Sequence, residues 1–196
     1  MARKWLSRAA LAGSLAALAT GIAVPTTASA HFVKAPCDFI TAGGFVFKDD
    51  GAMANFGAHG GCKNDAFWGH VNYVDHETNW HISSTEITGY LYDPAFPNKR
   101  DICGWARTND DITVRFRVTL TDNGEPGRND EFGIAIDTQN QIPGDRFYIV
   151  TSRKLANGQG GGGNVQLHKG NNSNTATDAM RALKEWQMCG DLNSPM

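Results

Sequence analysis

Apolar and polar residues alternate with a period of two along most of the chain, which is the pattern of half-buried β-strands. The clearest case runs from Ile112 to Leu120, where five apolar side chains alternate with polar ones that include Arg117 and Thr119. Because successive side chains of a strand point to opposite faces, we expect this strand to have one buried face and one solvated face.

Shorter stretches with the same pattern are 45–47, 53–56, 67–75, 81–84, 87–92, 102–106, 132–136, 147–151 and 165–167. Turn residues separate them, as in Asp49–Gly51 and Asp122–Gly127. The glycine-rich stretch Gly158–Gly163 lacks the ending of a phosphate-binding loop, so we interpret it as a hairpin connection. Many short strands at this spacing predict a mostly β protein, namely an antiparallel β-sandwich or jelly-roll-like single domain.

One segment, about 175–188, has helical periodicity instead. Ala179, Leu183 and Trp186 fall on one face, and Gly190 follows at a position where helices often end. We expect one C-terminal helix packed against a β-rich core that spans 37–170.

The first 30 residues have the three parts of a cleavable secretory signal. Three basic residues lie within the first eight positions, an apolar stretch covers 11–24, and Ala28-Ser29-Ala30 fits an export cleavage site. The apolar stretch is too short and too broken by Gly and Thr for a good membrane span, so we favour cleavage over a retained anchor. We expect cleavage after Ala30, release outside the cell, and a mature single domain over 31–196.

Loss of this segment would change the charge of the protein. The whole chain has 18 Lys and Arg against 20 Asp and Glu, a net charge of −2. The signal holds three of the basic residues and no acidic one, so the mature domain would carry −5. An acidic domain has no electrostatic reason to bind nucleic acid or an anionic membrane. We therefore expect no nucleic-acid partner and no membrane insertion after cleavage.

Four cysteines lie beyond the signal, an even number that predicts two disulfides in an oxidising compartment. Four cysteines allow three pairings, and their spacing does not match a zinc site. We favour Cys62 with Cys103 and Cys37 with Cys189, because the second bond would tie the ends of the domain together and close a long loop.

Four ordered motifs carry a resemblance to a known group of domains. They are Gly60–His76, Ile87–Tyr90, Thr121–Ile134 and Gly161–His168. Over about residues 40–170 the chain resembles the post-COAP-1 type module of secreted bacterial proteins. The resemblance implies a small extracellular β-rich module, often an appendage of larger surface proteins, and it brings no catalytic residues with it.

Histidine provides the first candidate chemistry. If the chain turns after Asp75, then His70, His76 and His81 fall beside it, and such a group suits a transition metal. The alternative is a set of polar cross-strand pairs on a solvated sheet face. His31 would become the N-terminus after cleavage, where its amine and imidazole could join a second histidine around copper.

A turn rich in oxygen atoms provides the second candidate. Asp122, Glu125 and Asp130 could hold calcium, and a turn whose carboxylates bond to backbone amides explains the same residues. We expect no cofactor, and among metals calcium fits the residues better than a transition metal does.

Aromatic side chains provide the third candidate. Trp68, Trp80, Tyr90 and Trp105 could stack on sugar rings or a partner protein, or they could fill the core. An exposed row of such rings on one sheet face would favour glycan binding.

These patterns favour a secreted, disulfide-stabilised module that is not catalytic and that binds or decorates an extracellular surface, glycan or protein. One alternative is a small metal-dependent secreted enzyme that uses the histidine group or His31. The other is a structural component of an envelope or spore coat.

Overall fold

Nine antiparallel strands make up most of the described chain, which comprises residues 33–141, 146–156 and 160–195 of a computed structural model. They are β1 (Phe39–Phe47), β2 (Met53–Lys63), β3 (Ala66–Asp75), β4 (Trp80–Asp93), β5 (Phe96–Thr108), β6 (Thr113–Thr121), β7 (Glu131–Asp137), β8 (Phe147–Lys154) and β9 (Gly161–His168). The mostly β class predicted from the alternation is therefore confirmed.

The strands form a single sheet in which sequence neighbours are spatial neighbours. β1 to β8 follow one another across the sheet, and β9 adds to the free side of β1, so the described strands leave one seam, between β8 and β9. A jelly roll would interleave its strands as two Greek keys. The meander found here therefore differs from the jelly-roll topology that we expected.

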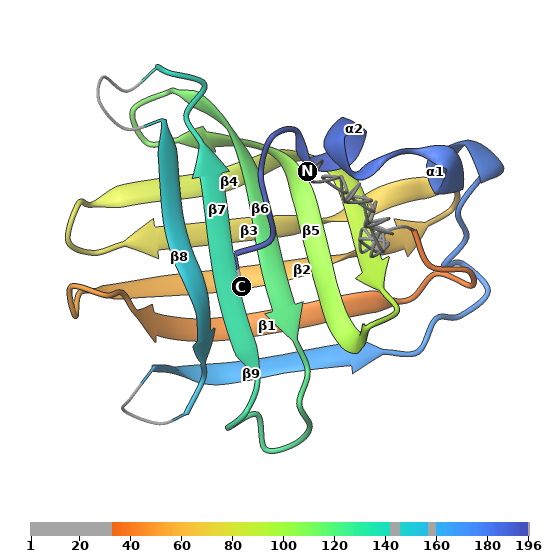
Figure 1. The fold of residues 1–196 in the computed structure, drawn as a ribbon, viewed down its shortest axis with the longest axis horizontal. Coiled ribbons are helices and arrows are strands. Elements are labelled where there is room, and N and C mark those ends of the chain that lie inside the picture. Colours follow the sequence, from red (N-terminus) through yellow and green to blue (C-terminus); the bar gives the residue numbers. More distant parts are fainter. Residues whose placement is uncertain (1–32, 142–145, 157–159, 196) are drawn as a thin grey trace, which may run out of the picture.

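The sheet curls over itself into two layers that cross steeply (Figure 1). β6, β7 and β8 form one layer, and β1, β2, β3 and β9 form the other. The long strands β4 and β5 connect the layers, and their register shifts three times, between Ser84 and Glu86, between Ile87 and Gly89 and between Tyr92 and Asp93. Such bulges bend a strand and let it pass from one layer to the next. The two strands predicted in this region are thus one bent strand.

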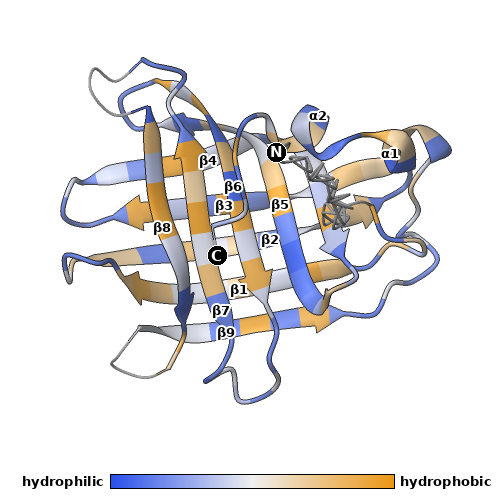
Figure 2. Cartoon of the chain, in the orientation of Figure 1, coloured by the Kyte–Doolittle hydropathy of each residue, from blue (hydrophilic) through white to orange (hydrophobic). Residues whose placement is uncertain are grey.

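The inward side chains of both layers form one apolar core. The residues predicted to point inward between Val114 and Leu120 are fully buried, and Phe56 of β2 stacks on Phe132 of β7 with ring centroids 3.8 Å apart. Figure 2 shows the corresponding hydrophobic and hydrophilic bands along the strands. Full burial of a large apolar side chain contributes roughly 1.5–3 kcal/mol, so contacts of this kind hold the two layers together.

The opposite face of β6 is buried at its centre, so the prediction of a solvated face is wrong there. Arg117 and Thr119 are 0% and 1% exposed. The C-terminal segment, residues 185–195, lies across the outer side of β5, β6 and β7 (Figure 1) and covers them. We call this segment the C-terminal strap. Alternation predicts which residues share a face, but it does not predict what covers that face.

Two short helices replace the single C-terminal helix that we expected. α1 spans Asp178–Ala182 and α2 spans Glu185–Cys189, with extended backbone at 183–184 between them. α2 lies against β4, where Met188 packs directly on Gly89. The break lets α2 lie on the sheet in its own direction, which one continuous helix would not allow.

The two disulfides join Cys37 to Cys62 and Cys103 to Cys189, so the pairing expected from the sequence is wrong. β1 and β2 form a hairpin whose register brings Cys37 beside Cys62. Cys62 points into the core, whereas Cys103 points outward from β5 and meets Cys189 where α2 lies on the sheet. Because Cys62 and Cys103 lie on opposite faces of the sheet, they cannot bond to each other.

Candidate ligand-binding face

The four residues predicted to share a metal do not converge. Asp75 points into the core and is fully buried, whereas His70 and His81 lie on the outer face. These two imidazoles contact opposite ends of Asn72, whose amide nitrogen is 3.1 Å from His70 Nε2 and whose amide oxygen is 3.2 Å from His81 Nε2. His76 lies apart, in the β3–β4 turn. Among the described residues, no three or more His, Cys, Asp or Glu side chains form a group that could hold a metal ion.

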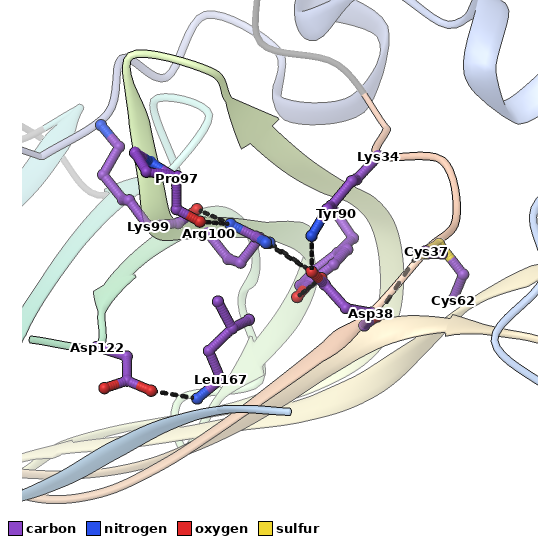
Figure 3. Close-up of polar contacts among 10 residues, drawn as sticks. All are labelled: Lys34, Cys37, Asp38, Cys62, Tyr90, Pro97, Lys99, Arg100, Asp122 and Leu167. Atoms are coloured by element: carbon purple, nitrogen blue, oxygen red, sulfur yellow. Dashed lines mark hydrogen bonds and ion pairs between the residues drawn. A yellow bond between two sulfur atoms is a disulfide. The ribbon is translucent and has the colours of Figure 1, made fainter. Parts of the chain in front are cut away.

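The residues predicted to bind calcium bind nitrogen donors instead. Asp122 accepts hydrogen bonds from an amide of its own loop and from Leu167 N at 2.7 Å (Figure 3). Asp130 accepts one from the same loop and one from Val165 N at 2.7 Å. Glu125 is exposed at the edge of the loop. These N–H groups bond to the carboxylate oxygens that a cation would need. Asp122 and Asp130 therefore serve as hydrogen-bond acceptors for backbone N–H groups of the β6–β7 loop and of the free edge of β9.

One end of the core is closed by a buried ion pair. Arg100 of β5 is fully buried and donates to Asp38 twice, from Nε to Oδ1 at 3.0 Å and from Nη2 to Oδ2 at 2.6 Å (Figure 3). Tyr90 and Lys34 each donate to the same carboxylate at 2.8 Å. Burial opposes ionisation of Asp38, but these donors outweigh it and hold its pKa below the ordinary value. The group fixes the segment before β1 to the interior of β5.

The other end of the core is closed by a second polar group. Tyr148 of β8 donates to Asp75 Oδ2 at 2.9 Å, and its hydroxyl lies 2.6 Å from that of Tyr73. Lys48 Nζ lies 2.9 Å from the same Asp75 oxygen. Burial raises the pKa of Tyr148, and it raises that of Tyr73 to about 12, so both hydroxyls stay protonated. Asp75 therefore has a structural role. Its buried carboxylate is closed to a ligand, whereas the outer surface of the sheet is accessible.

The strap covers one part of that outer surface. Arg117 Nη2 lies 2.5 Å from Asp101 Oδ2, and Arg117 Nη1 donates to Leu192 O at 2.9 Å. Trp105, one of the aromatics proposed as ligand-binding, is half-buried here, with the Arg115 guanidinium 4.7 Å from its ring centroid. The outer face of β5 and β6 is thus occupied by the protein's own C-terminal residues.

The outer face of β9, β1, β2 and β3 lies open at its centre. Its outward residues include Asn164, Gln166 and His168 of β9, Phe39, Thr41, Phe45 and Phe47 of β1, Asn55 and His59 of β2, and Trp68, His70 and Asn72 of β3. Gly43 and Gly57 are opposite each other at the centre, and a Cβ atom at either position would meet no atom of the described residues within 4 Å. We call this surface the aromatic face.

Aromatic rings gather at one end of the aromatic face. Phe39 stacks on the imidazole of His168 with centroids 4.4 Å apart, and Trp68 meets Phe39 edge-on at 6.2 Å. His59 lies 5.0 Å from Trp68, and the ammonium of Lys63 lies 5.5 Å from the same indole. Phe39, His59, Trp68 and His168 are all partly exposed, so their neighbours hold them while part of each ring stays accessible.

A second aromatic pair lies at the other end. Phe45 and Phe47 meet edge-on with centroids 5.6 Å apart. Phe45 is six residues from Phe39 on the same strand, which is about 20 Å at 3.3 Å per residue. The glycine pair lies between them, with an asparagine on each side in register. The face therefore has aromatic ends, amide-bearing sides and a centre free of side chains.

His59 is the most unusual ionisable group of the aromatic face. Burial lowers its pKa, and the nearby His70, whose ring centroid is 6.4 Å away, lowers it further. His59 makes no hydrogen bond to another residue in the described part of the chain. Within the described chain, its ring nitrogens therefore have no hydrogen-bond partner.

Only Trp68, of the four aromatics proposed from the sequence, belongs to this face. Trp80 and Tyr90 point into the core and are 8% and 0% exposed. The sequence pattern did not identify Phe39 and His168, because their contact depends on pairing between the first and last strands. Alternation could group the outward residues of β1, but apolar residues occur on both of its faces, so the pattern did not tell the outer face from the inner.

Comparison of the chain with protein-family models, with curated proteins and with solved structures gives no match. The resemblance to the post-COAP-1 type module therefore stays a prediction. The two disulfides indicate an oxidising compartment outside the cytoplasm. No helix of the described residues is long and apolar enough to span a membrane. The predicted signal and the predicted copper ligand His31 lie outside the described residues.

Proposed function

We propose that this protein is a secreted, non-catalytic module that binds an extracellular glycan through the aromatic face. The observation that carries the proposal is the pair of partly exposed aromatic clusters at the two ends of an open sheet face. In this proposal residues 1–30 direct export and are removed after Ala30, and the curled sheet is a β-sandwich scaffold.

The chemistry of the face suits a sugar chain. The faces of pyranose rings carry C–H groups that pack on flat aromatic rings, while the edges carry hydroxyl groups that need hydrogen-bond partners. Trp68 and Phe39 offer the rings, and Asn164, Gln166 and Asn72 offer both donors and acceptors. The open glycine centre lets an extended chain approach the backbone closely.

The aromatic face is also rigid, which lowers the entropic cost of binding. Its side chains stand on four hydrogen-bonded strands. The Cys37–Cys62 disulfide joins the segment just before β1 to the end of β2, next to the cluster that contains Phe39 and Trp68. A ligand would therefore meet rings that are already in position, and preorganisation of this kind raises affinity.

Binding of the secreted, oxidised chain to a panel of soluble polysaccharides, followed by titration calorimetry of those that bind, tests the proposal. Loss of the Trp68 ring in Trp68→Ala should remove about 1.5–3 kcal/mol of binding, a tenfold to hundredfold loss of affinity. Trp186→Ala is the matched control, because Trp186 is 68% exposed on α2, away from the aromatic face. This variant should bind like the wild type.

A second variant keeps the test independent of folding. Gly57→Phe places a ring in the open centre, where its Cβ meets no atom of the described chain within 4 Å, so the protein should fold and the ligand should be blocked. Binding to none of the polysaccharides would contradict the proposal, as would equal loss of affinity in Trp68→Ala and Trp186→Ala.

A further inference from the structure

The aromatic face has an unusual charge pattern. The chain contains 20 Asp and Glu, yet the four strands of this face contain one, Asp75, and it points inward to Lys48. No outward residue of these strands, all of which are described, is acidic. An acidic protein therefore presents one face without carboxylates.

The same face carries three of the six histidines of the chain. His59 and His70 are opposite each other on β2 and β3, and His168 is stacked on Phe39 at the aromatic end. Lys63 adds a permanent positive charge beside Trp68. Histidine is the side chain whose charge changes between pH 5 and 8, so this face gains positive charge as the surroundings become acidic.

Among the described residues, no carboxylate of this face pairs with those imidazoles. His70 contacts Asn72 and Ser84, and His168 contacts the hydroxyl of Thr41. His59 contacts Trp68 and His70, both from β3.

The acidic residues that are nearest in sequence to these strands lie at the margins of the aromatic face, and each interacts with a residue other than the three histidines. Glu125, in the β6–β7 loop, accepts a hydrogen bond from the Asn164 amide. Burial lowers the pKa of Arg115, and the negative charge of Glu86 on β4 opposes that shift by favouring the charged form of Arg115. Asp65 lies in the turn between β2 and β3, where its amide bonds to Thr175. Protonated imidazoles on the aromatic face would therefore repel one another until an external anion neutralised them.

We propose that the glycan bound by the aromatic face is anionic, carrying carboxylate, phosphate or sulfate groups, and that His59, His70 and His168 bind those groups when protonated. This inference rests on the proposed function and names the class of glycan. Anions bind the protonated imidazoles, so by linkage the affinity rises as the pH falls. Because the charges are at the surface, added salt should weaken the binding.

A matched pair of polymers tests the inference, namely polygalacturonate and its fully methyl-esterified form, which share a backbone and differ in charge. Affinity is measured from pH 8 to pH 5.5 at constant ionic strength. Polygalacturonate should bind about tenfold or more tightly at the lower pH, and the ester should show no such change. The triple variant His59→Gln/His70→Gln/His168→Gln should lose the pH dependence, whereas His76→Gln, in the β3–β4 turn, should keep it.

The outcomes separate the two proposals. Equal, pH-independent binding of both polymers would overturn the anionic assignment and leave glycan binding in place. Binding of polyglutamate as tight as that of polygalacturonate would show that charge alone is recognised and would also overturn it. A pH dependence that survives in the triple variant would show that these histidines do not bind the anionic groups. Binding of neither polymer, together with failure of the polysaccharide panel, would end the proposed function itself.

Discussion

Arg117 holds the C-terminal strap on the sheet through a buried ion pair, and its replacement by Met should strongly destabilise the protein. Its guanidinium donates to Asp101, to the carboxylate of Glu185 and to Leu192 O, and its side chain has no exposed surface. Met fills a similar volume but donates no hydrogen bond. Asp101, also buried, would then lose the cation that faces it.

The size of the effect follows from the burial. Removing one partner of a buried ion pair costs about 3–5 kcal/mol, because the other charge stays buried without compensation. At a urea m-value of about 2 kcal/mol/M, the unfolding midpoint should fall by roughly 1.5–2.5 M. The double variant Arg117→Met/Asp101→Leu removes both charges and should recover much of the loss, since apolar replacements of buried pairs are often tolerated.

Urea unfolding followed by tryptophan fluorescence measures these changes, with the disulfides intact. The matched control is Arg107→Met, because Arg107 lies on β5 in an exposed pair with Asp111, in which the side chains are 58% and 79% exposed. Exposed pairs contribute at most about 1 kcal/mol, so this control should unfold near the wild-type midpoint. Equal midpoints for Arg117→Met and Arg107→Met would refute the structural role of the buried pair, and so would a double variant no more stable than the single one.

Two further changes test the packing of the strap and the closure of the core. Gly89→Ala would place a Cβ atom 2.5 Å from Met188 Cβ, so α2 must shift and thermal unfolding should show a loss of about 1–3 kcal/mol, whereas Gly43→Ala, in open space, should cost far less. The lowered pKa of Asp38 means that its stabilising contribution is complete above the unfolded-state pKa of about 3.9 and is lost as the pH falls through the lower folded-state pKa. Asp38→Asn should therefore be less stable at neutral pH and show a flatter decline in unfolding free energy between pH 5 and 2; a wild-type slope would show that Asp38 does not titrate as described.

Much of the secondary structure could be predicted because its cause is local. The alternation from Val114 to Leu120 identified the inward residues of β6 correctly, since side chains two apart on a strand share a face. The β class, the strand between Phe67 and Asp75 and the presence of two disulfides were likewise predicted correctly. The helix failed because periodicity did not reveal the break at 183–184, where extended backbone separates α1 from α2.

The candidate site was less accessible to prediction, because proximity in sequence is a poor guide to proximity across a curled sheet. Asp75 and His76 are consecutive, yet one points into the core and the other lies in an exposed turn. Phe39 and His168 come from opposite ends of the domain and stack on each other. The register between β9 and β1 produces that contact, and no local pattern encodes it.

The sequence by itself determined where most strands run, which residues face the core together, and that the four cysteines form two bonds, because alternation and composition act over a few neighbouring residues. Only the tertiary structure decided the disulfide pairing, the burial of Arg117 beneath the strap, and the meeting of Phe39, Trp68 and His168 on one open face. Those features depend on contacts between distant segments. A charged side chain can be buried where a distant segment supplies its partner, and a sheet face stays open where no segment lies across it.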